Sequence, residues 1–141
     1  MAEFDRFLNG VLEDKLLNLH TAAPCRVVSF DIGRKRAAVQ PLFMAKEMGK
    51  PPVARPIIEE VPVLSHRYTE IEYYGSAEAG EPVQEREVEK VRTPIYKAGD
   101  VVLVAFSERA LEAPILSGKV SYPAHRRRHS LTDAVILGVI L

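Results

Sequence analysis

Several features that mark whole classes of protein are missing from this sequence. It has a single cysteine, Cys25, among 141 residues, which excludes an internal disulfide and a cysteine-built zinc site. It also has no net charge, because 19 basic side chains balance 19 acidic ones. This balance argues against a protein whose main task is to neutralise phosphates or anionic lipid. A protein partner is the more economical expectation.

Long apolar runs are lacking too. The longest tract, residues 134–141, has eight residues including Gly138, which is too short for a membrane span. Glu3 and Asp5 precede any apolar stretch, whereas a signal peptide starts with basic residues. We therefore expect a soluble chain with no targeting signal and no stable membrane insertion.

Motifs for catalysis, cofactors and metals are also missing. The sequence has no glycine-rich phosphate loop and no serine elbow. His125 and His129 are four residues apart, but the three arginines between them oppose a bound cation. We expect no catalytic residue, no metal and no cofactor. A weaker alternative is an enzyme built around Cys25, although the local sequence places no general base beside this thiol.

The clearest periodic pattern lies near the N-terminus. Over residues 3–20, apolar side chains recur at three- and four-residue steps with polar residues between them, which predicts an amphipathic helix. Pro24 ends the pattern, because the residue before a proline is pushed out of the helical region. The helix packs either on its own fold or on a neighbouring subunit. Its candidate interface residues are Phe4, Phe7, Leu8, Val11 and Leu12.

Five short segments rich in β-branched and aromatic residues predict strands. The most distinctive is Val101–Phe106, six consecutive apolar residues after a Gly-Asp turn, which we expect to be buried on both sides. In the loop between the first two strands, we expect Gly33 to supply a positive φ. The other predicted strands are residues 26–30, 36–43, 57–64 and 134–141, with residues 46–56 as a proline-rich loop. Together these segments predict an all-β fold, a small barrel over residues 23–141 preceded by the N-terminal helix in residues 1–22.

Residues 65–92 are the most polar part of the chain. They hold seven glutamates against four basic side chains, with a small-residue break at 75–80. They form either a long polar hairpin that stands off the barrel or a solvated loop. The only concentrated positive charge, formed by Arg126, Arg127 and Arg128, is expected to pair with these glutamates, within the chain or across a subunit boundary.

The apolar C-terminal segment predicts a closing barrel strand. Chain ends are usually polar and frayed, so this one is unusual. Either a partner covers it or something normally follows it. The candidate interface residues here are Val135, Leu137, Val139 and Leu141.

Five pieces of the sequence occur in a characteristic order: Leu19–Asp31, Ala38–Leu42, Val61–Leu64, Lys97–Arg109 and Arg128–Ala134. Together they resemble the N-terminal OB-fold domain of the membrane-piercing baseplate spike proteins of contractile phage tails. The likeness covers nearly the whole chain. It identifies the predicted barrel as an OB-fold barrel.

The resemblance implies a structural protein without turnover, a homotrimer at the axis of a tail baseplate that is assembled in the host cytoplasm. Its partners would be further copies of itself, a tail tube or hub protein and a needle or tip protein. In the family a β-helical needle follows the OB-fold domain, so here the needle is either a separate protein or lies outside this sequence. An alternative from another class is an OB-fold protein that binds single-stranded nucleic acid, although aromatic residues interleaved with the arginines are missing.

Overall fold

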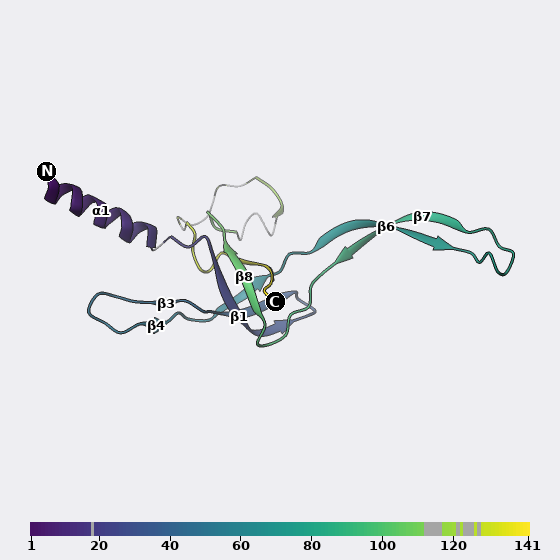
Figure 1. Cartoon of the computed structure of the whole chain (residues 1–141), viewed down its shortest axis with the longest axis horizontal. Coiled ribbons are helices and arrows are strands. Elements are labelled where there is room, and N and C mark those ends of the chain that lie inside the picture. Colours follow the sequence, from purple (N-terminus) through teal and green to yellow (C-terminus); the bar gives the residue numbers. More distant parts are fainter. Residues whose placement is uncertain (18, 112–116, 121, 123–125, 127) are drawn as a thin grey trace.

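The computed structural model describes residues 1–17, 19–111, 117–120, 122, 126 and 128–141. Five strands build a curled central sheet, and the helix and two hairpins project from it (Figure 1). The elements of the described residues are α1 (Ala2–Leu17), β1 (Ala22–Asp31), β2 (Arg36–Pro41), β3 (Met44–Ala45), β4 (Val53–Ala54), β5 (Ile58–Pro62), β6 (His66–Tyr74), β7 (Gln84–Arg92), β8 (Val101–Phe106) and β9 (Ala134–Val139).

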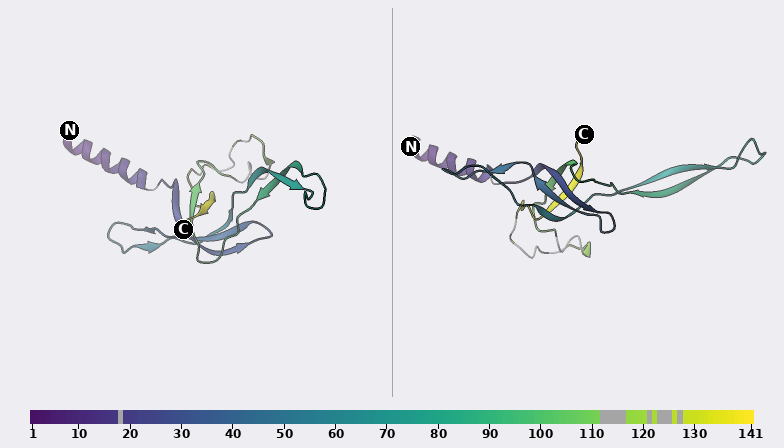
Figure 2. Two further views of the ribbon diagram at one scale, coloured as in Figure 1. Left: turned by 45° about the vertical axis from the view of Figure 1, so that its right-hand side comes forward. Right: turned by 90° about the horizontal axis from the view of Figure 1, so that it is seen from below.

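The central sheet has the strand order β5-β2-β1-β8-β9, and each neighbouring pair is antiparallel. The sheet curls so strongly that its two outer strands approach each other (Figure 2). An isolated parallel bridge between Val63 and Ile136 joins them. A curled, partly open five-stranded barrel is the architecture of a small OB-like fold. The predicted all-β fold with an N-terminal helix is confirmed.

The predicted barrel strands all occur, although their ends differ from the prediction. β1 begins at Ala22 instead of residue 26, because its first residues pair with β8 from Ala22↔Ala105 onward. β9 ends at Val139, two residues before the predicted end. β4 lies within the segment 46–56, which was expected to be loop, and pairs with β3 in a short second sheet.

The core lies inside the curl of the sheet. β1, β2, β8 and β9 contribute alternate residues to it, whereas β5 contributes Ile58 and Val61, three positions apart. β8 buries Val102, Val104 and Phe106, but Leu103 on its other side is 37% exposed. The expectation that this strand is buried on both sides is therefore wrong for a single chain, because only one face of the sheet points inward. The least exposed core side chains are Cys25, Val27, Val39, Val61, Val102, Val104 and Ile136. Each large apolar side chain buried in this way contributes about 1.5–3 kcal/mol.

The turn before β8 fixes this strand against β1. The Val27 N–H donates to the Asp100 carbonyl oxygen, and the Gly99 N–H donates to the Val27 carbonyl oxygen, both at 2.8 Å. The Asp100 carboxylate also accepts the Lys97 N–H at 2.9 Å, which closes the turn on itself. Gly99 has a φ of 98°, a backbone conformation that residues with a Cβ rarely adopt.

The loop between β1 and β2 differs from the prediction. The residue with a positive φ is Lys35, at 56°, and Gly33 does not have one. The Asp31 carboxylate accepts the Arg34 N–H at 3.1 Å, so a side-chain-capped turn comes first and the left-handed residue follows it.

Three elements extend away from the barrel (Figures 1 and 2). α1 has no buried residue, so of the two arrangements considered for it, packing on its own barrel is not the one observed. β6 and β7 form a ribbon with nine paired positions, from His66↔Arg92 to Tyr74↔Gln84, and it projects on the opposite side of the barrel from α1. The short β3–β4 hairpin projects on the same side as α1.

Candidate protein interface

The N-terminal helix presents an apolar stripe that no part of the described chain covers. The helix is favoured locally by Glu3 and Asp5 in its first turn and Lys15 in its last, which match the helix dipole. The five predicted interface residues are exposed by these fractions: Phe4 63%, Phe7 67%, Leu8 44%, Val11 40% and Leu12 53%. Their three- and four-residue spacing sets them on one side of α1. A contiguous apolar stripe of this kind is typical of an interaction surface.

The C-terminal strand divides its side chains between the core and the outside. Ile136 is fully buried, while Leu137 and Val139 are 44% and 43% exposed. Val135 is half-buried, and Leu141 is fully exposed after the last strand residue. The predicted interface residues of this segment therefore lie at least partly at the surface.

A shallow groove continues this apolar surface toward the base of the β6–β7 hairpin. It is lined by side chains that include Leu64, Val91, Ile95, Leu137 and Val139. Each of these five residues is more than a third exposed. The C-terminal segment and the hairpin base thus form one apolar surface.

The outer face of β1 and β8 is a further apolar surface that the sequence reasoning did not identify. We call it the outer barrel patch, and its residues are Pro24, Arg26, Val101, Leu103 and Ala105. Arg26 lies opposite Val101, and Pro24 lies opposite Leu103, so these side chains share a face. The sequence did contain a signal for this patch, because the unbroken apolar run of β8 is typical of a strand that is covered on both faces.

The predicted arginine cluster is only partly described. Arg126 and Arg128 are exposed, whereas Arg127 and His125 lie outside the described residues. Within the described residues, the ion pairs of the segment 65–92 join its glutamates to basic side chains of the same segment. The expected pairing of the arginines with these glutamates inside one chain is not observed there.

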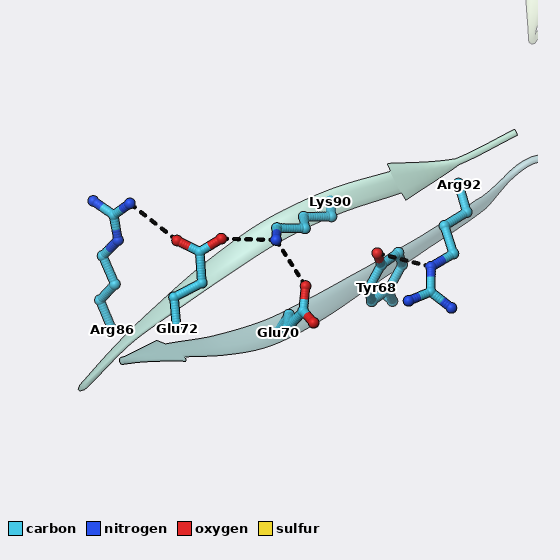
Figure 3. Close-up of polar contacts among 6 residues, drawn as sticks. All are labelled: Tyr68, Glu70, Glu72, Arg86, Lys90 and Arg92. Atoms are coloured by element: carbon cyan, nitrogen blue, oxygen red, sulfur yellow. Dashed lines mark hydrogen bonds and ion pairs between the residues drawn. The ribbon is translucent and has the colours of Figure 1, made fainter. Parts of the chain in front are cut away.

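The hairpin carries most of its charge network on one side, which we call the ionic face (Figure 3), whereas the Arg67–Glu89 ion pair lies on the other side. Lys90 Nζ lies 2.8 Å from Glu70 Oε2 and 2.7 Å from Glu72 Oε1. Arg86 Nη2 lies 3.0 Å from the other carboxylate oxygen of Glu72. Hydrogen bonds from Lys90 and Arg86 lower the pKa of Glu72, and those from Lys90 to Glu70 and Glu72 raise the pKa of Lys90.

Arginine–tyrosine contacts extend the ionic face toward both ends. Arg92 Nε donates to the Tyr68 hydroxyl oxygen at 2.8 Å, and the Arg92 guanidinium lies 4.4 Å from the centre of the Tyr68 ring. Arg86 lies over the Tyr74 ring at 5.7 Å. Most charged side chains of the ionic face are therefore paired with other side chains of the hairpin.

The opposite side of the hairpin has a different character, and we call it the apolar–acidic face. Register places Ile71 opposite Glu87 and Tyr73 opposite Glu85 on this side, with Val91 nearer the base. Ile71, Tyr73 and Val91 are 55%, 66% and 56% exposed. A shallow depression runs over Ile71, Glu85 and Glu87. The alternation of side chains in residues 66–74 and 84–92 predicts which residues share a face of the hairpin, but only when the pairing register of the two strands is known.

The single cysteine of the chain lies in the barrel core, where a thiol is a poor nucleophile. Cys25 is fully buried, and burial raises the pKa of its thiol to about 11, so it stays protonated at neutral pH. No group of three or more His, Cys, Asp or Glu side chains that could hold a metal ion occurs among the described residues. No helix of the described chain combines the length and apolar character that crossing a bilayer requires.

Comparisons with known proteins do not assign a family. No protein-family model matches the chain, and no curated protein is significantly similar to it. The features of the chain that bear on its function are therefore its sequence motifs, its OB-like fold and its exposed surfaces.

Proposed function

We propose that this chain is a structural component of the baseplate spike or hub of a contractile phage tail or phage-derived particle. It forms a homotrimer at the tail axis and links the tube or hub to the piercing tip. The proposal is supported by the resemblance of five ordered sequence pieces to baseplate spike proteins, together with the OB-like sheet to whose strands these pieces contribute.

The observation that carries the proposal is the amount of apolar surface on the outside of the barrel. Leu137 and Val139 line the groove at the base of the hairpin, and Leu103 is exposed on the outer face of β8; each is more than a third exposed. Soluble monomers rarely leave a contiguous apolar surface of this kind uncovered. A closed ring of identical copies would cover it on every subunit without leaving a free patch.

The helix gives the same assembly a second contact. α1 stands away from its own barrel with its apolar stripe exposed, so the stripe is available to another molecule. In a spike at the tail axis, that molecule is the next copy or the tube or hub protein above it. A separate needle or tip protein would occupy the other end.

Nucleic-acid binding has less support. OB-fold proteins that bind single strands stack bases on exposed aromatic rings of the barrel. In the described residues, the exposed aromatic side chains are Phe4, Phe7, Tyr73, Tyr74 and Tyr122, none of them on a barrel strand. The barrel thus offers no stacking platform among its described strands.

The mass of the chain in solution tests the assembly. Light scattering on the purified chain is expected to give three times 15.7 kDa, and a single-chain mass at all concentrations would count decisively against the proposal. Antibodies against the chain should then label the baseplate end of contractile tails released from producing cells. Salt-dependent retention on single-stranded DNA that is lost when Arg126, Arg127 and Arg128 are changed to alanine would favour the nucleic-acid binder instead.

A further inference from the structure

The outer part of the apolar–acidic face, around Ile71 and Tyr73, is left uncovered by the described residues. The hairpin projects away from the barrel (Figures 1 and 2). On this face, Ile71 and Tyr73 are more than half exposed. Among the described residues, neither Glu85 nor Glu87 belongs to an ion pair. An isolated two-stranded ribbon is only marginally stable in water. The face therefore has the composition of a contact surface, with apolar side chains beside unpaired carboxylates.

Charge indicates that a second copy of the chain is the partner. The segment 65–92 carries seven glutamates and four basic residues, a net charge of −3. Because the whole chain is neutral, the remaining residues carry +3. The acidic arm of one copy and the basic remainder of another are thus complementary, which steers association and fixes orientation.

The outer barrel patch has the matching pattern of side chains. Arg26 is its only charged residue and is exposed, with Pro24, Val101, Leu103 and Ala105 around it. Its guanidinium belongs to no ion pair among the described residues. One basic group within an apolar patch complements a surface in which two carboxylates stand beside two apolar side chains.

We infer that the apolar–acidic face of one chain's hairpin packs on the outer barrel patch of the next copy. Ile71 and Tyr73 cover Leu103 there, while Glu85 and Glu87 bind Arg26. The strands of the hairpin have nine residues each and span about 30 Å, enough to cross a neighbouring barrel. The contact joins two different surfaces, and such a contact generates a ring when the rotation from one copy to the next closes, as it does in a trimer. The inference rests on the proposed function for the assembly of identical copies, and it assigns the element that makes their contact.

Charge reversal tests the inference in the full-length chain. The double variant Glu85→Lys/Glu87→Lys places positive charges beside Arg26, and Arg26→Glu alone places a negative charge beside Glu85 and Glu87. Each variant should raise the dissociation constant of the assembly by about tenfold or more. The triple variant that combines all three changes should recover most of the loss. Glu78→Lys with Glu81→Lys is the matched control, because it changes the charge of the same segment equally at the exposed tip and should leave the assembly unchanged.

The outcomes separate this inference from the proposed function. A wild-type trimer that the Glu85 and Glu87 changes leave intact overturns the hairpin contact while the spike assignment stands, and the arm is then free for a different protein. A closed assembly of another size that is weakened by both single-side variants and restored by the triple variant supports the hairpin contact and counts against the trimeric spike. A wild-type monomer overturns both. Circular dichroism of each variant checks that the exposed substitutions leave the fold intact.

Discussion

Val63 and Ile136 form the one isolated parallel bridge of the described residues, and it joins the two ends of the curled sheet. Ile136 is fully buried at this point, and Val63 packs against the same core. The next residue along β9, Leu137, is exposed on the outside. The last strand of the chain therefore closes the barrel with one residue and offers an apolar surface with its neighbour.

Ile136→Ala is expected to lower the free energy of unfolding by about 2–5 kcal/mol, because it removes a buried side chain at the point where the barrel closes. Urea denaturation followed by circular dichroism measures the change. Ile32→Ala is the matched control, since it truncates an exposed isoleucine outside the proposed contacts and should barely alter the free energy of unfolding. Equal losses of stability for the two variants would show that Ile136 does not hold the closure.

Gly75→Ala is expected to loosen the hairpin without altering the barrel. Gly75 has a φ of 95°, and a Cβ added there would collide with the carbonyl oxygen of Pro82 across the loop. Amide hydrogen exchange should therefore become faster in β6 and β7 and stay the same in β1 and β8. Ala77→Ser changes an exposed residue of the same loop and should have no effect. Unchanged exchange in the alanine variant would mean that the loop does not hold the two strands in register.

The sequence predicted the positions of the helix and strands more accurately than it predicted which of their faces are buried. The three- and four-residue periodicity located α1, and clusters of β-branched residues located the barrel strands, because both signals are local. Val101–Phe106 was expected to be covered on both sides, yet a single chain supplies only one covering layer. An unbroken apolar run is typical both of a strand buried within one molecule and of a strand buried in an assembly. A sequence pattern cannot distinguish the two.

The surfaces proposed for assembly were predictable only in part. The stripe on α1 follows from helical spacing, whose geometry is fixed. The two faces of the hairpin depend on pairs such as Ile71↔Glu87, and a register shift of one residue would have exchanged them. The position of Arg26 beside Val101 depends on pairing between strands that are about 75 residues apart, which no local pattern reports.

Cys25 is expected to react with thiol reagents only when the barrel opens. Its side chain is fully buried, and burial raises its pKa to about 11, so little thiolate exists at pH 8. Alkylation of the native chain should be slow and should accelerate strongly in urea beyond the unfolding midpoint. A cysteine introduced at the exposed position Ser76 serves as the control and should react rapidly in the native state. Fast labelling of native Cys25 would contradict its position in the core.

The hairpin is expected to lose stability in acid before the barrel does. Hydrogen bonds from Lys90 and then Arg86 lower the pKa of Glu72 in the folded ribbon, so its ionised form is favoured by folding. The resulting stabilisation is present above the ordinary glutamate pKa of about 4.3 and is lost as the pH falls through the lower folded value. Hydrogen exchange of β6 and β7, corrected for intrinsic rates and compared with β1 between pH 6 and pH 3, measures the effect. Glu72→Gln removes the titrating group and should flatten the pH dependence of the hairpin, whereas Glu78→Gln at the tip should leave it unchanged. A hairpin whose protection falls equally in wild type and Glu72→Gln would show that the network around Lys90 does not hold the two strands together.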